Sequence, residues 1–275
     1  MPLPVAIQLY SVREEASRDL AGTLASLAEM GYTGVEFAGL YGFEPEAILP
    51  LLEKNKLAAV SAHVPLEEML EKPQEVIRDY QLLGCRYLAM PYLTPDRRPG
   101  SDGFQKTIRD IETFGRLCAA AGMTLLYHNH DFEFEKIGGE YALDMIYRTI
   151  SPEYLQTEID TCWVHVAGED PAAYIMKYTG RAPLVHLKDF VMPGKSKPAK
   201  LYELIGIEDK DKEPEAPEFS FMPLGSGVQD MPAILDASLR AGASWVVVEQ
   251  DRPAAGATPL ESAKRSRDYL GNLGW

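Results

Sequence analysis

The amino-acid sequence predicts a single α/β domain over residues 1–275, a (β/α)8 TIM barrel with a long loop insertion after its seventh strand. Eight short segments of apolar, β-prone residues alternate with segments of helical period, and this alternation is typical of a parallel barrel. The chain of 275 residues suits one such barrel of about 250 residues. The turn "LYSVREE" after the first segment lacks the glycines of a doubly wound open sheet, so the barrel is the better prediction.

The expected strands cover residues 5–10, 34–38, 57–64, 86–92, 123–130, 155–160, 183–189 and 245–250. Between them, apolar residues recur at helical spacing, as at Leu20, Leu24, Leu27, Ala28 and Met30, and at Ile108, Ile111, Phe114, Leu117 and Cys118. Glycines follow several helical segments shortly before the next strand, namely Gly31, Gly84, Gly122, Gly180 and Gly242. We expect these glycines to end their helices in the left-handed conformation.

One segment interrupts the alternation of strands and helices. Residues 190–222 are polar and rich in Pro, Lys and Glu, and they follow the seventh expected strand. A long loop at that end of a barrel is either a flexible excursion or a lid over the barrel mouth, and we expect a lid. The same segment could equally serve as a dimer arm, which leaves a homo-oligomer open.

Composition restricts the partners of the protein. The net charge of −14 argues against nucleic acid, because phosphate binding needs clustered Lys and Arg. Cys85, Cys118 and Cys162 have no ligand spacing, and we expect reduced structural thiols. The N-terminus "MPLPVAIQLY" has no signal-peptide pattern, and no apolar run is long enough to span a membrane. We therefore expect a cytoplasmic protein that binds a small molecule, with no membrane partner.

Polar residues gather where the expected strands end. Reactive groups of such barrels lie at the carboxyl ends of the strands and in the loops that follow. The residues at these ends are Gln8, Tyr10, Glu36, His63, His128, Asn129, His130, Glu158, Asp160, His186, Lys188, Glu249 and Asp251. Four of the five histidines of the chain belong to this set, and His165 does not. The sequence therefore predicts an active site at this end of the barrel.

A metal site is the strongest prediction within this set. Asp160, His186 and Glu249 end three successive strands, so their side chains should converge. Side chains alternate between the two faces of a strand, which places Glu158 on the face of Asp160, and Lys188 on that of His186. Carboxylates with imidazoles suit Mn²⁺, or Zn²⁺, Co²⁺, Mg²⁺ and Fe²⁺, and not a structural thiolate site.

Other polar residues have a structural as well as a functional interpretation. A lone histidine such as His63 is often a hydrogen-bonded core residue, and Glu36 could pair inside the barrel. Trp163 could pack at the rim or stack on a sugar ring. Asp131, Glu133 and Glu135 fit a solvated loop.

The chain resembles the xylose-isomerase-like barrels of the sugar phosphate isomerase/epimerase type. The motifs that carry the resemblance are "IQLYSVRE", "GYTGVEFAG", "SAHVPLE", "YHNHDFEF", "EIDTCWVHVAGEDP", "VHLKDF", "PLGSGVQDM" and "VVVEQDRP". The resemblance implies a divalent metal held by Glu, Asp, His and Glu from strands five to eight. Asp160, His186 and Glu249 match the last three of these ligands.

Two positions depart from the family pattern. The run "HNH" places His128 where the family has its first metal ligand, a Glu, and Ser226 replaces an acid in "PLGSG". Either His128 ligates the metal, or Glu158 supplies the missing carboxylate from the neighbouring strand. We expect Glu158, because Glu-x-Asp puts both carboxylates on one face of the strand.

The expected chemistry is divalent-metal-dependent enolisation of a keto sugar or related polyol, giving isomerisation, epimerisation or β-elimination. The expected catalytic residues are Glu158, Glu249, His128, His130 and Lys188. The expected substrate-binding residues are Gln8, Glu36, His63, Asn129 and Trp163. One alternative is a sugar-binding barrel without turnover. An apurinic-site endonuclease-like hydrolase is a remote alternative, because its zinc site needs more imidazoles and its DNA groove needs positive charge.

Overall fold

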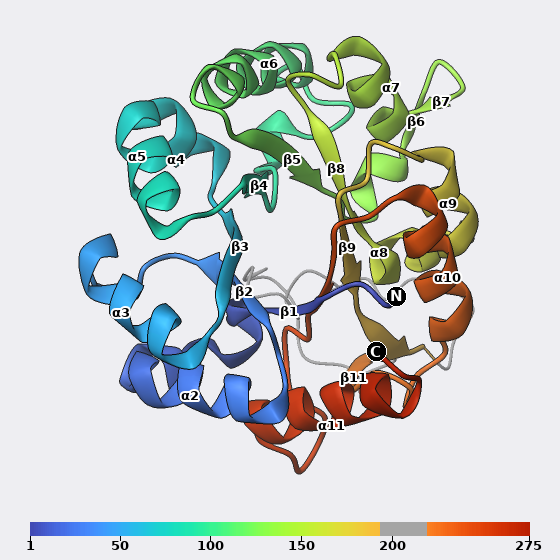
Figure 1. Ribbon diagram of the computed structural model, residues 1–275. Coiled ribbons are helices and arrows are strands. Elements are labelled where there is room, and N and C mark those ends of the chain that lie inside the picture. Colours follow the sequence, from blue (N-terminus) through green and yellow to red (C-terminus); the bar gives the residue numbers. More distant parts are fainter. Residues whose placement is uncertain (193–218) are drawn as a thin grey trace, which may run out of the picture.

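The computed structural model describes residues 1–192 and 219–275. Eight parallel strands close into a barrel in the order β1-β12-β9-β8-β5-β4-β3-β2, and helices surround the ring of strands (Figure 1). The barrel strands are β1 (Val5–Gln8), β2 (Gly34–Ala38), β3 (Ala58–His63), β4 (Tyr87–Met90), β5 (Thr124–His128), β8 (Gln156–Asp160), β9 (Leu184–Leu187) and β12 (Trp245–Val248). All eight expected strands are present, so the predicted (β/α)8 barrel is confirmed.

Several strands are shorter than the apolar runs that predicted them. Leu9–Val12 forms the 3-10 helix η1 and does not extend β1. β4 ends at Met90, immediately before Pro91, which has no N–H to donate to a neighbouring strand. β5 ends at His128, so Asn129 and His130 follow the strand instead of lying in it.

Helices separate consecutive barrel strands. The α-helices are α1 (Arg13–Arg18), α2 (Leu20–Met30), α3 (Pro45–Asn55), α4 (Leu66–Glu71), α5 (Pro73–Leu83), α6 (Phe104–Ala120), α7 (Ala142–Thr149), α8 (Thr161–Val166), α9 (Pro171–Lys177), α10 (Met231–Ala241) and α11 (Pro259–Asn272). Two further 3-10 turns are η2 (Pro95–Arg97) and η3 (Phe132–Phe134), and a small hairpin pairs β6 (Lys136–Ile137) with β7 (Glu140–Tyr141). The five expected end glycines all have positive φ, at Gly31, Gly84, Gly122, Gly180 and Gly242.

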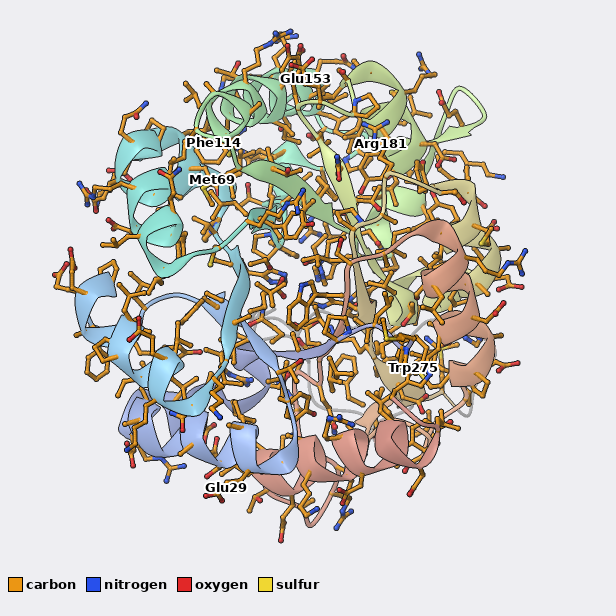
Figure 2. All side chains as sticks on the ribbon, viewed as in Figure 1. Glu29, Met69, Phe114, Glu153, Arg181 and Trp275 are labelled. Atoms are coloured by element: carbon orange, nitrogen blue, oxygen red, sulfur yellow. The ribbon has the colours of Figure 1, made fainter. Side chains whose placement is uncertain are left out.

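Apolar side chains fill two layers, one between the strands and the surrounding helices and one inside the ring of strands (Figure 2). The inner layer consists of Ala6, Val60, Tyr87, Ala89, Leu126, Leu184 and Val247. Several of these residues precede a polar residue of the predicted site by two positions, as Leu126 precedes His128 and Leu184 precedes His186. Because alternate residues share a face, the polar site lies directly above this apolar plug and is shielded from water on that side.

The ends of the predicted 190–222 insertion form a short antiparallel pair, β10 (Asp189–Val191) with β11 (Ser220–Met222). Phe190, Phe219 and Phe221 pack with Trp163 at this pair. The predictions of a lid and of a dimer arm concern residues 193–218, which lie outside the described residues.

The three cysteines are free and buried, as expected for structural thiols. No helix within residues 1–192 and 219–275 is both long enough and apolar enough to cross a membrane.

Candidate metal centre and active site

The strand register brings the predicted site residues to one end of the barrel. His128 pairs with Glu158 between β5 and β8, and Asp160 pairs with His186 between β8 and β9. Gln8 pairs with Glu36 between β1 and β2. Because these residues end neighbouring strands, their side chains meet inside the barrel mouth, where each is at most 4% exposed.

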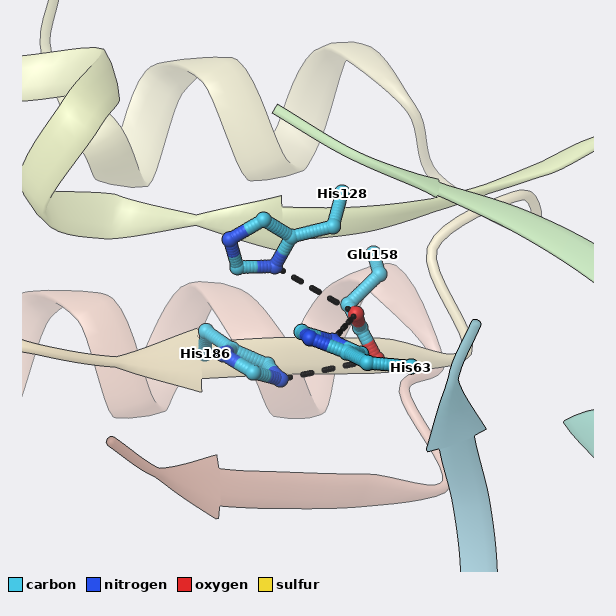
Figure 3. Close-up of side chains that lie close together, drawn as sticks. All are labelled: His63, His128, Glu158 and His186. Carbon is cyan, nitrogen blue, oxygen red and sulfur yellow. Dashed lines mark hydrogen bonds and ion pairs between the residues drawn. The ribbon is translucent and has the colours of Figure 1, made fainter. Parts of the chain in front are cut away.

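A first cluster is called the inner group: His63, His128, Glu158 and His186 (Figure 3). Glu158 is its centre. Its Oε2 lies 2.7 Å from His63 Nε2 and 3.3 Å from His128 Nδ1, and its Oε1 lies 3.5 Å from His186 Nε2. Glu158 thus contacts all three imidazoles of the group.

Glu36 completes the floor beneath the inner group. Its Oε1 accepts hydrogen bonds from Gln8 Nε2 at 2.7 Å and His186 Nε2 at 2.8 Å, and lies 3.1 Å from His63 Nε2. Its Oε2 accepts a hydrogen bond from Ser61 Oγ. Both oxygens of the Glu36 carboxylate therefore have protein donors.

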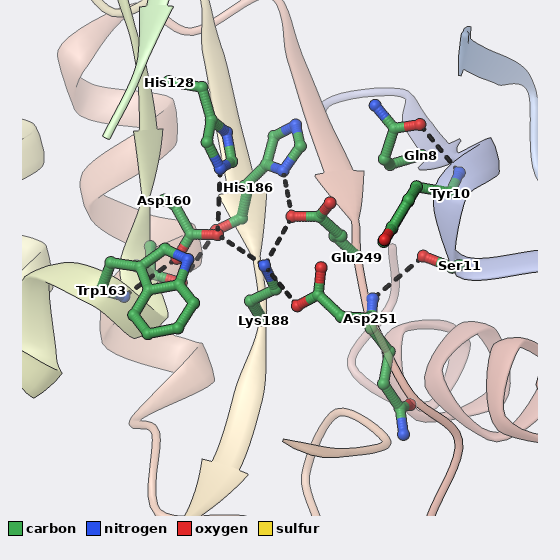
Figure 4. A network of polar contacts seen from close by, with 12 residues as sticks. Gln8, Tyr10, Ser11, His128, Asp160, Trp163, His186, Lys188, Glu249 and Asp251 are labelled. Atoms are coloured by element: carbon green, nitrogen blue, oxygen red, sulfur yellow. Dashed lines mark hydrogen bonds and ion pairs between the residues drawn. The ribbon is translucent and has the colours of Figure 1, made fainter. Parts of the chain in front are cut away.

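A second cluster is called the outer group: His128, Asp160, His186 and Glu249 (Figure 4). His186 Nδ1 lies 3.0 Å from Glu249 Oε2, and His128 Nε2 lies 3.8 Å from Asp160 Oδ2. One ligand atom from each of the four residues lies within 4.8 Å of the others. The three residues predicted to converge do converge. The structure groups His128 with them, whereas Glu158 lies in the inner group with His63, His128 and His186.

The outer group has the composition and the unsatisfied capacity of a metal site. Two imidazoles and two carboxylates form a mixed N/O set that suits a divalent transition metal. Asp160 caps the start of α8, since its Oδ1 accepts a hydrogen bond from the backbone N–H of Trp163. Asp160 Oδ2 is buried and accepts no hydrogen bond from any described residue. These donors fit a divalent cation.

Lys188 lies beside the outer group and is fully buried. Its Nζ lies 2.8 Å from Glu249 Oε2, 2.8 Å from Asp251 Oδ2 and 3.3 Å from Asp160 Oδ2. Burial opposes the charge of Lys188, but the Asp251 and Glu249 carboxylates outweigh it and raise the Lys188 pKa well above its usual range. Lys188 is therefore an ammonium ion that compensates part of the carboxylate charge.

The inner group divides its imidazoles into two charge states. Burial lowers the pKa of His186, but the carboxylates of Glu158 and Glu36 outweigh burial and raise that pKa well above its usual range. Burial lowers the pKa of His63, but the carboxylates of Glu36 and Glu158 outweigh burial and raise that pKa to about 10. Burial holds the pKa of His128 well below its usual range. His63 is thus a cation between two carboxylates, whereas His128 is neutral, the state in which imidazole binds metals.

A cavity of about 450 Å³ opens above the outer group. Its lining residues are Tyr10, Ala38, Gly39, His63, Pro65, Pro91, Tyr92, His128, His130, Lys188, Glu249 and Asp251. The volume suits a small organic ligand. Among the expected substrate-binding residues, only His63 lines this cavity.

The other expected substrate-binding residues lie behind the cavity wall. Gln8 is hydrogen-bonded to Glu36 and to the backbone N–H of Tyr10. The Asn129 side chain accepts a hydrogen bond from Asp160 N at 3.0 Å and donates one to Asp160 O at 3.3 Å, so it ties the end of β5 to β8. Trp163 is fully buried beneath the Lys188 ammonium, which lies 5.4 Å from its ring centre.

His130 lines the cavity with an unused polar atom. Its Nδ1 is buried and has no hydrogen-bond partner among the described residues. The backbone N–H of His130 donates to Glu133 Oε2 at 2.8 Å, and Glu133 Oε1 accepts from the Tyr127 hydroxyl at 2.7 Å. Glu133, expected in a solvated loop, is fully buried, because η3 folds it back toward β5. Asp131 is also buried, whereas Glu135 is exposed, as expected.

Sequence reasoning placed Asp251 at the end of the eighth strand without giving it a role, and it did not select Tyr92; both residues line the cavity. A signal existed for Asp251, which follows Glu249 by two residues and therefore shares its face. Tyr92 had no such signal, since it lies in the loop after β4 and reaches the cavity only through the path of that loop.

Fold and site together define a (β/α)8 enzyme barrel with a buried imidazole and carboxylate cluster at the carboxyl ends of its strands. The family model described as xylose isomerase-like TIM barrel matches residues 24–273. The chain belongs to that family, which confirms the resemblance seen in the sequence motifs. The family and relatives named for an enzyme activity identify the chain as an enzyme.

Comparisons with known proteins agree with this assignment. An inosose dehydratase of Geobacillus kaustophilus (strain HTA426) is 23% identical over 273 residues, which cover 91% of this chain and 86% of the relative. A solved sugar phosphate isomerase/epimerase from Parabacteroides distasonis ATCC 8503 superposes with a TM-score of 0.78 at 20% identity, covering 98% of this chain and 94% of the other. The IolI protein, solved with a bound zinc atom, gives a TM-score of 0.74 at 14% identity, with 98% of each chain covered.

Proposed function

We propose that the protein is a divalent-metal-dependent enzyme that enolises a keto sugar or keto-polyol and then eliminates a β-oxygen substituent. The convergence of His128, Asp160, His186 and Glu249 below the cavity carries this proposal. The name of the inosose dehydratase relatives favours elimination over isomerisation or epimerisation. The chain is similar to these relatives at low identity, so the particular keto substrate is left to the experiment.

The outer group would hold the cation, and Mn²⁺ is our first choice for a site of two imidazoles and two carboxylates. When bound, such a cation supplies Lewis acidity toward a carbonyl and its neighbouring hydroxyl. The zinc atom in the IolI protein is consistent with a divalent cation in a barrel of this fold.

The remaining polar residues of the cavity can move protons. His130 presents a buried Nδ1 without a hydrogen-bond partner among the described residues, and we assign it the removal of the proton next to the carbonyl. Lys188 lies at the same end of the cavity with its ammonium beside Glu249 and Asp251. We assign Lys188 the stabilisation of negative charge on the substrate oxygen.

Glu249, expected both as a metal ligand and as a catalytic residue, and His128, expected as a catalytic residue, act in this proposal as metal ligands. The expected roles of Gln8, Glu36, Asn129 and Trp163 in substrate binding become indirect, since these side chains lie behind the cavity wall. A cytoplasmic location and a homo-oligomer remain predictions.

Deuterium exchange tests the proposal. The protein is incubated in D₂O with Mn²⁺ and a panel of ketoses, keto-inositols and 3-keto-glucosides, and products are analysed by mass spectrometry. We expect deuterium beside the carbonyl and, for the true substrate, an unsaturated product. Asp160→Asn should abolish both. Equal exchange in chelator-treated protein, or in Asp160→Asn, would contradict a metal-dependent enolisation.

A further inference from the structure

His128 and His186 are shared by the two clusters, and each turns a different nitrogen to each side. His128 Nδ1 lies 3.3 Å from Glu158 Oε2, and its Nε2 lies 3.8 Å from Asp160 Oδ2. His186 Nε2 lies 2.8 Å from Glu36 Oε1, and its Nδ1 lies 3.0 Å from Glu249 Oε2. A neutral imidazole binds a metal through one nitrogen and carries its proton on the other. Each ring can therefore serve only one side as a ligand.

On the inner side, both Glu36 oxygens and Glu158 Oε2 already have hydrogen-bond partners, whereas Glu158 Oε1 and His128 Nδ1 have none among the described residues. Glu36 accepts from Gln8, His186 and Ser61, and His63 Nε2 joins it to Glu158 at distances of 3.1 and 2.7 Å. The His63 ring also stacks on His186, with ring centres 5.3 Å apart and planes 9° from parallel. An ion placed here would have to displace these donors from Glu36 and Glu158.

The outer side has a carboxylate oxygen without a hydrogen-bond donor in the described part of the chain. Asp160 Oδ2 accepts no hydrogen bond from a described residue, and its neighbours are the Lys188 ammonium at 3.3 Å and His128 Nε2 at 3.8 Å. Glu249 and His128 also line the cavity, which gives an ion and its substrate access from that side. Both sides border the cavity, the inner side through His63 and His128. They differ because an ion on the inner side would have to displace donors that already contact Glu36 and Glu158, whereas Asp160 Oδ2 on the outer side has no hydrogen-bond donor within residues 1–192 and 219–275 to displace.

We infer that Glu158 and Glu36 are positioning residues that fix the protons of His128 on Nδ1 and of His186 on Nε2. The opposite nitrogens, His128 Nε2 and His186 Nδ1, then face a single cation held with Asp160 and Glu249. This inference rests on the proposed metal-dependent function. Glu158, expected as a metal ligand, would instead orient the ligand His128 through the imidazole nitrogen that does not face the metal.

The arrangement has a consequence for affinity. A carboxylate that accepts the other N–H of a ligand imidazole fixes its orientation and increases its basicity, and loss of such a partner costs about 10- to 100-fold in metal affinity. Glu158 is the only described carboxylate in ion-pair contact with His128 Nδ1. His63 holds Glu158 in place from the other side at 2.7 Å.

Cobalt binding tests the inference without reference to activity. Apo protein is titrated with Co²⁺ against a chelator, and the visible absorption spectrum of the Co²⁺ complex is recorded. Glu158→Gln should bind Co²⁺ about 10- to 100-fold more weakly, with one ion per chain and an unchanged spectrum. Asp160→Asn should change the spectrum, since it alters a ligand. Glu133→Gln is the matched control, because Glu133 is an equally buried Glu whose hydrogen bonds reach Tyr127 and His130 instead.

Several results would overturn the inference. A Glu158→Gln spectrum altered as in Asp160→Asn makes Glu158 a ligand, and two Co²⁺ ions per chain make the inner group a second metal site. Unchanged affinity in Glu158→Gln removes the positioning role alone, whereas a wild-type chain that binds no divalent cation removes the proposed function as well. Should Glu158→Gln fail to fold, Glu158→Asp keeps the charge, withdraws the carboxylate from His128, and should show the same weakening.

Discussion

The Lys188 ammonium lies 2.8 Å from Glu249 Oε2, the same oxygen that lies 3.0 Å from His186 Nδ1. Glu249 Oε2 thus contacts both the buried Lys188 ammonium and His186, a candidate metal ligand. Since Lys188 also contacts Asp251 at 2.8 Å, it balances the carboxylates of the barrel mouth in the absence of a metal.

Lys188→Met should therefore destabilise the protein strongly. The substitution leaves Glu249 and Asp251 as buried carboxylates without their cation, and breaking a buried pair costs about 3–5 kcal/mol. Urea unfolding of the metal-free protein measures the loss. Lys264→Met is the matched control, because Lys264 pairs with Asp268 on the exposed surface and such pairs contribute about 0–1 kcal/mol. Equal effects of the two substitutions would show that Lys188 does not balance buried charge.

Metal binding should stabilise the folded chain. A cation that binds only the folded state adds about 2.7 kcal/mol at about 100 times its Kd, and Tm should rise accordingly when Mn²⁺ is added to chelator-treated protein. Asp160→Asn should lose this rise, because it removes an outer-group ligand. The same Tm increase in Asp160→Asn would place the binding elsewhere.

His130→Gln should slow proton exchange by about 100-fold or more, the usual contribution of a general base. Deuterium incorporation into the keto substrate in D₂O measures the rate, and metal affinity should stay close to that of the wild type. His165→Gln is the control, because the His165 ring contacts Gln229 and does not line the cavity. A His130→Gln rate equal to that of the wild type would exclude the assigned role.

Glu133 should make the stability of the protein depend on pH. Burial raises its pKa from 4.5 to about 7, although the Tyr127 hydroxyl opposes the shift. Because the folded pKa is the higher one, the contribution of protonated Glu133 is complete below pH 4.5 and is lost as pH rises through about 7. The stability of wild type relative to Glu133→Gln should fall by roughly 3 kcal/mol between about pH 5 and about pH 8, as measured by urea unfolding. A difference that is constant or grows over this range would contradict the assigned direction.

Asp189→Asn should loosen the loop that follows β11. The Asp189 carboxylate accepts hydrogen bonds from the backbone N–H groups of Phe190, Gly225, Gly227 and Gln229. An amide can serve only half of them, so we expect a loss of about 2–3 kcal/mol and faster hydrogen exchange in residues 223–229. Asp230→Asn is the matched control, because Asp230 caps α10 and Asn caps a helix equally well. Unchanged exchange in this loop would show that the carboxylate does not organise it.

The sequence was sufficient to predict the barrel and the end of the barrel that holds the site. Strand-length apolar runs, helical periodicity and end glycines are local signals, and all eight strands follow them. The convergence of Asp160, His186 and Glu249 was also predictable, since parallel neighbouring strands bring their carboxyl ends together. Strand alternation correctly predicted that Glu158 and Asp160 lie on the same face of β8. It did not predict that they belong to different clusters.

Contacts that depend on loop paths were not predictable from the sequence. Glu133 is buried because η3 turns it back onto Tyr127, and Tyr92 reaches the cavity from the loop after β4. Likewise, Asn129 holds the backbone of Asp160 instead of facing the cavity. Each of these contacts joins residues whose separation is set by the three-dimensional course of a loop and has no periodic signal.

The sequence by itself determined which chemical groups the barrel mouth contains: four imidazoles, several carboxylates and one lysine at the carboxyl ends of the strands. Only the tertiary structure decided how they are paired. The closing of the ring set Glu158 at the floor against His63 and left His128 facing Asp160. Strand alternation fixes the face of a side chain, but its height along the barrel axis depends on the stagger between strands, which emerges only when the barrel closes.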